Sequence, residues 1–224
     1  MTDEPAERPI SIDIVSDVVC PWCFVGKRKL DKALEAFPQT PIEIRWRPFQ
    51  LDPTIPPGGV DRQAYLEGKF RDPARIAQIH QRLEETGREL GIAFAFDKIK
   101  RSPNTLDAHR LIRWAHSVGR QSEVSEDLFR LYFVEGVDIG DRGVLARVAE
   151  KNGLDAAIVA RLLEDGSDIG AVQDEIASAV RLGVSGVPFY IFDSKFAVPG
   201  AQQTEVLVAA INKAREDTAA VLSA

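Results

Sequence analysis

The first regular pattern along the chain is an alternation of apolar and polar residues. Residues 10–14 read Ile-Ser-Ile-Asp-Ile, which is the period of a β-strand with one buried face. Apolar residues then recur at helical spacing over residues 24–37, and Pro38 ends this predicted helix. A second alternation over residues 42–47 predicts another strand. We therefore expect a βαβ unit, whose right-handed crossover makes its two strands parallel.

The pattern changes after a stretch rich in proline and glycine at residues 51–60. Helical periodicity dominates from there to residue 182, without an internal repeat. Two short strands at residues 189–193 and 195–198, joined by a tight turn, and a closing helix at residues 205–221 follow. The order is thus β-α-β, then a helical block of about 120 residues, then β-β-α.

This order is that of an α/β protein with a thioredoxin-like fold and a large α-helical insertion between the βαβ and ββα halves. The inference combines the pattern with analogy, because the pattern alone does not determine strand order. We expect residues 10–60 and 184–224 to form the thioredoxin-like domain. In this interpretation residues 61–183 form the inserted α-helical domain, and residues 1–9 form a flexible amino terminus.

The composition is that of an ordinary soluble globular protein, with 45% hydrophobic and 28% charged residues among 224. A chain of this length can bury a core without disulfides or metal ions. Its 28 Lys and Arg residues against 34 Asp and Glu give a net charge of −6, which argues against a nucleic-acid or anionic-membrane partner. The first ten residues lack a basic and apolar leader, and no apolar run of about 18 residues occurs, so we expect a cytoplasmic protein without a membrane span.

The chain has only two cysteines, Cys20 and Cys23, in a Cys-Pro-Trp-Cys sequence. In a reducing compartment a permanent structural disulfide is not expected, which leaves redox catalysis or metal binding as the main functions. A zinc site would need two further ligands, and the three histidines do not follow the spacing of common zinc motifs. Two inert buried cysteines are a further alternative. We favour redox catalysis, with no metal and no other cofactor, because the dithiol itself can serve as the redox centre.

The position of this pair between the first strand and the first helix supports redox chemistry. A thiolate attacks a disulfide, and the unpaired backbone N–H groups at a helix N-terminus favour the thiolate of Cys20. Pro21 fits the first helical position, where its missing N–H costs no hydrogen bond. Cys23, one turn further in, is placed to resolve a mixed disulfide on Cys20, and Trp22 offers an aromatic face to a partner. We expect Cys20 to be solvent-accessible and Cys23 to be more buried.

Two segments of the chain resemble a known family. CPWCFVGKRKL resembles the active-site segment of cytoplasmic DsbA-like thioredoxin-fold proteins of the FrnE type, and SGVPFYIFDSKFAVPGAQ resembles their proline loop, hairpin and last helix. With a helical block of matching length between them, the resemblance covers nearly the whole chain. It implies a thiol–disulfide oxidoreductase in which a cis-proline, here Pro188, faces the dithiol. The backbone of Val187 would then pair with an extended substrate.

The same group is similar to 2-hydroxychromene-2-carboxylate isomerases and kappa-class glutathione transferases, in which a serine commonly occupies the position of Cys20. A glutathione-dependent isomerase or transferase of this type is therefore the first alternative function, and it should tolerate the loss of Cys23. A redox-inactive peptide-binding module is the second alternative. Cysteines at both positions favour the redox function.

Residues 102–110 resemble a segment that these relatives place at the mouth of the cleft, which makes Asn104 and His109 candidate substrate-binding residues. A second interpretation is a helix start, with Asn104 or Ser102 as its N-cap and His109 on a solvated face. The basic residues 27–29 either attract an anionic substrate or form a solvated helix face, and we favour the solvated face.

We therefore predict a thiol–disulfide oxidoreductase with Cys20 as its nucleophile and Cys23 as its resolving thiol. Its partners are a protein or small-molecule disulfide or thiol, and glutathione or another thiol closes the cycle. The physiological substrate, the direction of electron flow and the oligomeric state, monomer or homodimer, do not follow from the sequence.

Overall fold

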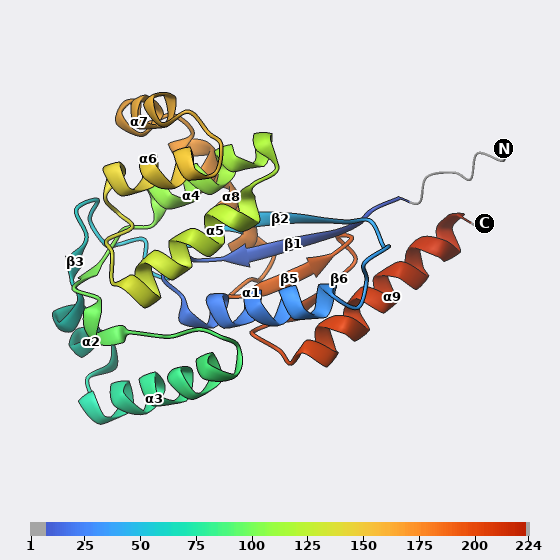
Figure 1. Ribbon diagram of the computed structural model, residues 1–224, viewed down its shortest axis with the longest axis horizontal. Coiled ribbons are helices and arrows are strands. Elements are labelled where there is room, and N and C mark those ends of the chain that lie inside the picture. Colours follow the sequence, from blue (N-terminus) through green and yellow to red (C-terminus); the bar gives the residue numbers. More distant parts are fainter. Residues whose placement is uncertain (1–7, 223–224) are drawn as a thin grey trace.

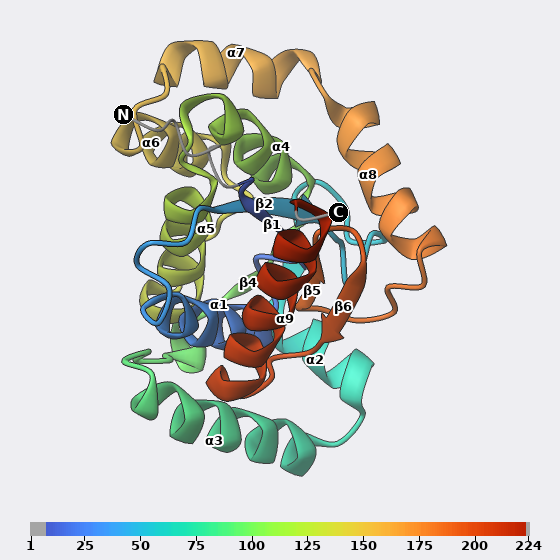
Figure 2. The same ribbon diagram turned by 90° about the vertical axis from the view of Figure 1, so that its right-hand side faces the viewer.

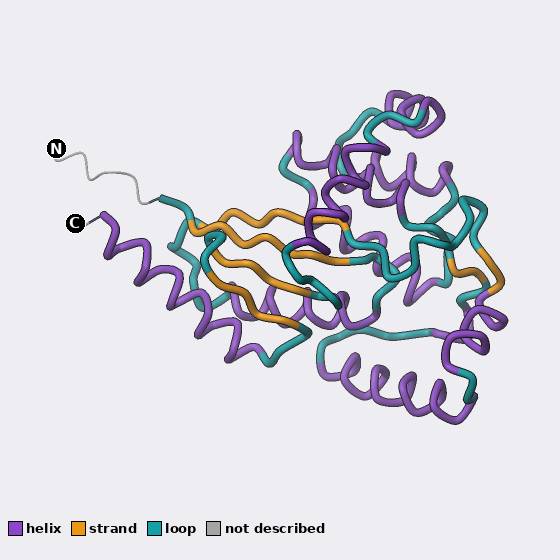
Figure 3. The backbone as a smooth tube through the Cα atoms, turned by 180° about the vertical axis from the view of Figure 1, so that it is seen from behind, coloured by secondary structure: helices purple, strands orange, loops and turns teal. Residues whose placement is uncertain are grey.

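A mixed sheet of four strands, in the order β2-β1-β5-β6, forms the centre of the molecule in the computed structural model, which describes residues 8–222 (Figure 1). Strand β1 (Ile10–Ser16) pairs in parallel with β2 (Ile42–Pro48) and antiparallel with β5 (Phe189–Phe192). Strand β6 (Phe196–Pro199) pairs antiparallel with β5. Figure 3 shows these four strands side by side. The predicted parallel βαβ unit and the late hairpin are therefore confirmed.

The prediction of a flexible amino terminus falls mainly outside the described part of the chain. It concerned residues 1–9, and residues 1–7 are not among those that the structure describes.

Helices cover both faces of the sheet. Helices α1 (Pro21–Leu34) and α9 (Thr204–Leu222) pack against each other on one face, and α8 (Ile169–Arg181) lies on the opposite face (Figure 2). The alternation in β1 explains this arrangement, because its isoleucines pack into the core that contains α1, whereas Val15 packs with Ala179 of α8. The first and last parts of the chain thus supply the four strands of the central sheet, and α8, from the segment predicted as an insertion, packs on one face of it.

The helical block lies between these two parts in sequence, at the end of the sheet toward which β1 runs (Figure 1). Strands β3 (Val60–Asp61) and β4 (Arg101–Ser102) pair antiparallel within it. A strand of two residues has no periodicity, so the sequence does not predict this small second sheet. The remaining helices are α2 (Arg62–Phe70), α3 (Pro73–Glu89), α4 (Leu106–Ala115), α5 (Gln121–Arg130), α6 (Arg142–Lys151) and α7 (Ala156–Asp165), with single 3₁₀ or π-helical turns at Phe96–Lys98, His116–Val118 and Leu131–Glu135.

An aromatic cluster joins α1 to the helical block. Phe24, near the start of α1, stacks on Phe129 of α5 with ring centroids 5.2 Å apart, and Phe94 meets Phe24 edge-on at 6.0 Å. Phe24 and Phe129 are almost fully buried. Offset stacked and edge-to-face contacts are the preferred geometries of aromatic pairs. The start of α1 is therefore held firmly between the sheet and the block.

The basic residues 27–29 do not form the solvated helix face that we expected. Lys27 and Lys29 are each only 8% exposed. Lys27 and Arg28 both pair with Glu126 of α5, at 3.1 and 2.5 Å. The Nζ atom of Lys29 donates to the carbonyl oxygen of Ala201 at 3.3 Å. The prediction is wrong because other elements pack over this face of α1, which the periodicity of α1 alone does not reveal.

Candidate active site at the dithiol

Both cysteines lie at the amino end of α1. Cys20 is the residue before the helix, with an extended backbone (φ −91°, ψ 112°), and Pro21 is the first helical residue. The backbone N–H of Cys23 donates to the carbonyl oxygen of Cys20 at 3.0 Å, which brings the two residues together across the first turn. The first N–H groups of a helix have no acceptor within the helix, so Cys20 occupies an electropositive location. Both side chains are free thiols.

Both thiols are nevertheless buried. Cys20 is 4% exposed and Cys23 is 2% exposed, so the prediction of a solvent-accessible Cys20 is wrong for this structure. The segment before β5 shields Cys20 from solvent, because the Sγ atom of Cys20 lies 3.6 Å from the carbonyl oxygen of Val187. A contact across 167 positions of the sequence is not visible in local spacing.

The thiol of Cys23 has a strongly shifted acidity. Burial raises its pKa well above the ordinary value, and the neighbouring Cys20 raises it further. The hydroxyl of Ser16 and the backbone of Asp17 act in the opposite direction and lower the pKa. Cys23 therefore keeps its proton in the resting protein.

The proline loop before β5 lies against α1. The Val187–Pro188 peptide bond is cis, the geometry that the resemblance implied, and the side chain of Pro188 is buried. Gly26 of α1 faces this loop: a Cβ atom there would lie 2.9 Å from Cγ of Pro188 and would collide with the hydroxyl of Tyr190. Glycine at this position thus allows the close approach of helix and loop that covers the dithiol.

Asp17 is a buried charged residue next to the dithiol that the sequence analysis did not single out. It is 1% exposed, and its carbonyl oxygen accepts the N–H of Cys20 at 2.9 Å. Its Oδ2 atom accepts the N–H of Leu51 at 2.8 Å, and its Oδ1 atom lies 3.5 Å from Nε2 of His109. Asp17 therefore ties the dithiol loop to the loop after β2 and lies beside His109 of α4. A sequence feature could have pointed to Asp17 as a residue of the site, because it is the only charged residue between Asp13 and Lys27.

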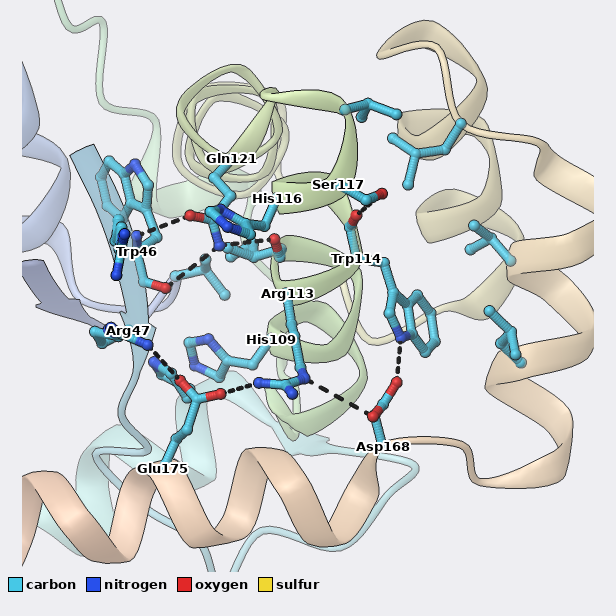
Figure 4. A pocket seen from close by; sticks show the side chains of 18 of the residues that line it. Trp46, Arg47, His109, Arg113, Trp114, His116, Ser117, Gln121, Asp168 and Glu175 are labelled. Atoms are coloured by element: carbon cyan, nitrogen blue, oxygen red, sulfur yellow. Dashed lines mark hydrogen bonds and ion pairs between the residues drawn. The ribbon is translucent and has the colours of Figure 1, made fainter. Parts of the chain in front are cut away.

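His109 does not lie on a solvated face, as the second interpretation of its segment held. It is 3% exposed, and its Nε2 atom lies 2.8 Å from the carbonyl oxygen of Phe49. Its ring also lines a cavity of about 640 Å³ between β2, α4, α7 and α8 (Figure 4). Arg47 and Arg113 in the wall of this cavity both pair with Glu175. His109 thus lies between the loop after β2 and this cavity.

Asn104 holds the loop that follows β2. Its Oδ1 atom accepts the N–H of Leu106 at 2.9 Å, at the start of α4, and accepts a second hydrogen bond from the side chain of Gln50 at 3.1 Å. Its Nδ2 atom donates to the carbonyl oxygen of Ile55 at 2.6 Å. Ser102 has another role than an N-cap, because its hydroxyl accepts from Arg62 at 3.3 Å. Asn104 therefore holds both the start of α4 and the loop, but the residue that precedes α4 is Thr105, so neither Asn104 nor Ser102 is its N-cap.

A hollow of about 130 Å³ opens beside the dithiol, between the loop at Asp17–Pro21 and helices α2 and α3. Arg62 and Lys69 of α2 bring positive charge to its wall. Burial, and then the charge of Arg62, lowers the pKa of His80 in the same wall, so His80 is neutral near neutral pH. The hollow is mainly apolar, and its lining includes Val19, Leu51, Ile55, Ile79, Leu83 and Phe96.

The predicted substrate-binding residues take up different positions around this hollow. Pro21 lines it, whereas Asn104 and His109 are not among its lining residues in the described part of the chain. Trp22 is half-buried, and the guanidinium of Arg82 of α3 lies 5.6 Å from the centre of its ring. The structure thus brings together the two cysteines, Pro21, Val187 and Pro188. Asn104 and His109 contact the loop after β2 and do not line the hollow.

Among residues 8–222, no group of three His, Cys, Asp or Glu side chains is arranged to hold a metal ion. No helix within the same range is long and apolar enough to cross a bilayer.

A mixed sheet with a cysteine pair at the amino end of its first helix, next to the Val187–Pro188 loop, defines a dithiol protein of the thioredoxin fold. Residues 11–212 match the DSBA-like thioredoxin domain, and the chain belongs to this family.

Known proteins are similar to this chain over nearly its whole length. The chain is 27% identical over 204 residues to the uncharacterized protein YwbO of Bacillus subtilis (strain 168), covering 91% of this chain and 96% of YwbO. It is similar to the crystal structure of the probable DsbA oxidoreductase SCO1869 from Streptomyces coelicolor, with a TM-score of 0.83, 31% identity, and coverage of 92% of this chain and 89% of that one.

Two more distant structures share the fold alone. A 2-hydroxychromene-2-carboxylate isomerase is similar with a TM-score of 0.71 and 15% identity, covering 94% of this chain and 98% of the isomerase. The cytosolic disulfide reductase DsbM from Pseudomonas aeruginosa, solved with GSH, has a TM-score of 0.61 and 18% identity, covering 96% of this chain and 100% of DsbM. The fold therefore occurs in both redox and isomerase proteins, so the side chains of the site have to distinguish the two.

Proposed function

We propose that the protein is a thiol–disulfide oxidoreductase in which Cys20 is the nucleophile and Cys23 the resolving thiol. The observation that carries this proposal is the pair of free thiols one helical turn apart at the amino end of α1, with Cys20 at the residue before the helix. The helix N-terminus stabilises a thiolate at Cys20, and Cys23 lies within reach of a disulfide formed there. An isomerase that holds glutathione in the same fold has no use for the second thiol.

The cycle follows from thiol–disulfide exchange. The Cys20 thiolate attacks a substrate disulfide, one substrate sulfur leaves as a thiolate, and a mixed disulfide forms. Cys23 then attacks the Sγ atom of Cys20, which releases the second substrate sulfur and leaves a disulfide between Cys20 and Cys23. Two molecules of a thiol such as glutathione then reduce the Cys20–Cys23 disulfide to the dithiol and are themselves oxidised to a disulfide. With an oxidised protein and a dithiol substrate, the same steps run in reverse.

The surroundings of the dithiol fit an extended substrate that carries a small apolar group and a negative charge. The carbonyl oxygen of Val187, next to Sγ of Cys20, is placed to accept a backbone N–H from a substrate that binds beside the proline loop. The apolar hollow next to Pro21 offers space for one side chain, and Arg62 and Lys69 favour a substrate that carries a negative charge. Protein disulfides and small-molecule disulfides, glutathione disulfide among them, both meet these conditions.

The expected cytoplasmic location belongs to the same proposal, because thiols that would reduce the Cys20–Cys23 disulfide are kept reduced there. The oligomeric state, monomer or homodimer, stays a prediction.

The wild-type protein is expected to catalyse exchange with a disulfide substrate in a glutathione buffer. The measurement is the rate of reduction of a fluorescent peptide disulfide, with protein alkylated at both cysteines as the control. A rate equal to that of the alkylated protein would contradict the proposal, and would favour the peptide-binding alternative if the peptide still binds.

Replacing Asn104 with alanine is expected to raise KM about fivefold to tenfold while leaving kcat nearly unchanged, because a lost hydrogen-bond set of this kind is worth roughly 1–1.5 kcal/mol. The physical reason is that Asn104 holds the loop that carries Leu51 and Ile55 into the hollow, but does not reach the sulfurs. His109→Ala should act in the same direction, since His109 contacts the carbonyl oxygen of Phe49 in that loop. Steady-state kinetics of disulfide turnover measures both constants.

Asn152→Ala is the matched control for Asn104. Asn152 is also buried and also hydrogen-bonded, to Asp127 and to the carbonyl oxygen of Val148, but it lies at the end of α6. We expect the KM of the Asn152→Ala variant to stay at the wild-type value. A loss of kcat in Asn104→Ala with an unchanged KM would show that Asn104 acts on the chemical step instead.

A further inference from the structure

The largest cavity described above lies apart from the dithiol. Its volume is about 640 Å³, and β2, α4, α7 and α8 surround it (Figure 4). Neither cysteine is among the described residues that line it. Ser16 and Val18 belong to its wall. Asp17 and Val19, which alternate with them in sequence, line the hollow beside the dithiol instead. The segment before Cys20 therefore separates this cavity from the hollow.

The wall of the cavity is mainly apolar. Its aliphatic residues are Ile112, Val118, Leu154, Ile158, Val159 and Leu162. Val118 and Ile158 are 45% and 48% exposed, although both are large and apolar. Apolar side chains left exposed around a cavity are typical of a ligand-binding site. The volume also lies within the range of small-molecule sites, about 300–1,000 Å³. The cavity therefore fits a small molecule with an apolar body.

Two tryptophans of the wall offer aromatic surface to such a molecule. The ring N–H of Trp114 donates to Asp168 at 2.7 Å, and the ring N–H of Trp46 donates to the hydroxyl of Ser122 at 3.0 Å. Because both ring N–H groups are already bonded, each indole can offer only its apolar surface. Aromatic rings gain free energy from stacked or edge-on contact beyond the burial of their area. The wall thus favours an aromatic ligand.

The charged side chains of the wall balance one another. They are Arg45, Arg47, Arg113, Asp155, Asp168 and Glu175. Arg47 and Arg113 share Glu175, and Arg45 pairs with Glu43 at 2.8 Å. Asp155 accepts two backbone N–H groups at the start of α7. These groups present no net charge and already have partners, so a charged ligand would lose its hydration without gaining a free counter-ion. The wall therefore favours an uncharged ligand.

An unused polar atom of the wall belongs to His109. Its Nε2 atom lies 2.8 Å from the carbonyl oxygen of Phe49, which can only accept, so Nε2 carries a hydrogen. Its Nδ1 atom makes no hydrogen bond among the described residues, and in the neutral ring this atom is an acceptor. The ring extends from α4 towards β2 at the cavity wall (Figure 4).

The other buried polar side chains of the wall offer a ligand less. Gln121 is bonded at both ends of its amide group, to the N–H of Trp46 and to the carbonyl oxygen of Ile112. The hydroxyl of Ser16 has no partner, but it is fully buried. A buried acceptor such as Nδ1 of His109 gains from a donor, because leaving it unpaired costs free energy.

We propose that this cavity is a second binding site, and that it takes an uncharged aromatic compound with a hydrogen-bond donor, of which a phenol is the simplest example. The aromatic body lies against the tryptophans and the aliphatic wall, and the donor binds Nδ1 of His109. The inference does not depend on the redox chemistry of the dithiol.

The first test titrates the wild-type protein with 2-naphthol and with quinoline, followed by NMR of the ligand. Both are uncharged aromatic compounds of similar size near neutral pH, but quinoline has no donor. We expect 2-naphthol to bind with a Kd of about 0.1–1 mM, as is ordinary for a ligand of this size. Quinoline should bind about fivefold to tenfold more weakly, because one neutral hydrogen bond is missing. No binding of 2-naphthol at millimolar concentration, or equal affinity for both probes, would overturn the proposal.

A third probe, 2-naphthoate, tests the preference for an uncharged ligand. It carries a carboxylate in place of the hydroxyl. We expect it to bind at least about fivefold more weakly than 2-naphthol, because the arginines of the wall already have carboxylate partners. Tighter binding of 2-naphthoate than of 2-naphthol would overturn the proposed ligand class.

His109→Phe tests the hydrogen bond. Phenylalanine keeps a ring of similar size but has no Nδ1 atom. The affinity for 2-naphthol should fall about fivefold to tenfold, whereas the affinity for quinoline should stay within about twofold of the wild-type value. A merely structural role of His109 would weaken both probes equally, and that result would overturn the proposal.

Ile158→Trp and Val118→Trp test the location. Each places a large ring in the cavity, one from α7 and one from the turn after α4, at a side chain that is about half exposed and therefore tolerant of replacement. Both should weaken binding of 2-naphthol at least about tenfold, because a filled cavity has no room for the ligand. Val180→Trp is the matched control, since Val180 is 55% exposed on α8 and is not among the lining residues.

Unchanged binding in both cavity variants, or an equal loss in Val180→Trp, would show that 2-naphthol binds elsewhere and would overturn the proposal. None of these titrations requires turnover. A wild-type protein that binds 2-naphthol in the expected pattern but exchanges no disulfide would refute the proposed function and support the second binding site.

Discussion

Cys23→Ala is expected to stop the catalytic cycle halfway and to leave the substrate covalently attached to Cys20. Without Cys23 the mixed disulfide has no intramolecular thiol to resolve it, so only an outside thiol can release it. Cys20→Ser should lose roughly a thousandfold or more of the activity, because it removes the nucleophile itself. Intact-mass measurement after addition of a disulfide substrate detects the trapped adduct in Cys23→Ala and its absence in Cys20→Ser.

The same pair of variants separates the oxidoreductase from the isomerase. The comparison adds a hydroxychromene-type substrate with glutathione, assayed beside the disulfide substrate. An isomerase would retain its full activity in Cys23→Ala, since it has no mixed disulfide to resolve. That retention, together with no disulfide turnover by the wild type, would replace the redox assignment by the isomerase.

Arg110→Met is expected to lower the free energy of unfolding by about 3 kcal/mol, because it breaks a buried charged network from one side. Arg110 is fully buried and donates to the carbonyl oxygens of Leu162, Leu163 and Ser167. The first two belong to the last turn of α7, whose final carbonyl groups have no partner within the helix. Arg110 therefore caps α7 from α4, and its charge matches the negative end of the helix dipole.

Methionine keeps much of the volume of arginine but donates no hydrogen bond, so the carbonyl groups stay buried and unpaired. Arg113→Met is the control, because Arg113 lies one turn further along α4 but is 42% exposed, with Asp168 and Glu175 as partners. Its loss should cost less than about 1 kcal/mol. Urea denaturation followed by circular dichroism compares the two. Similar free energies for both variants would show that Arg110 does not cap α7.

The sequence predicts most of the fold around the site, because the signals are local. The alternation of residues 10–14 reappears as the buried face of β1, and the apolar repeat after the cysteines reappears as α1. The parallel pairing of β1 and β2 follows from the handedness of the crossover. Pro21 between the cysteines is the first helical residue, as its fixed φ predicts.

The sequence is a poorer predictor of which polar residues are buried. The sequence suggests Asn104 and His109 as substrate-binding residues, but in the structure they hold a loop and do not line the hollow. The sequence predicts that Lys27 and Lys29 lie on a solvated helix face, but both are buried in the structure. In each case the residue is held by contacts from another element of the chain. Helical periodicity within one segment does not predict those contacts.

The sequence by itself therefore determined the order of the elements and the placement of two thiols at a helix N-terminus, since spacing and periodicity act within a few residues. Only the tertiary structure decided the environment of those thiols. Val187 covers Cys20 from 167 positions away, and His109 meets Phe49 from 60 positions away. Burial, and with it the acidity of a thiol, depends on all surrounding segments together, and chain folding alone brings these into contact.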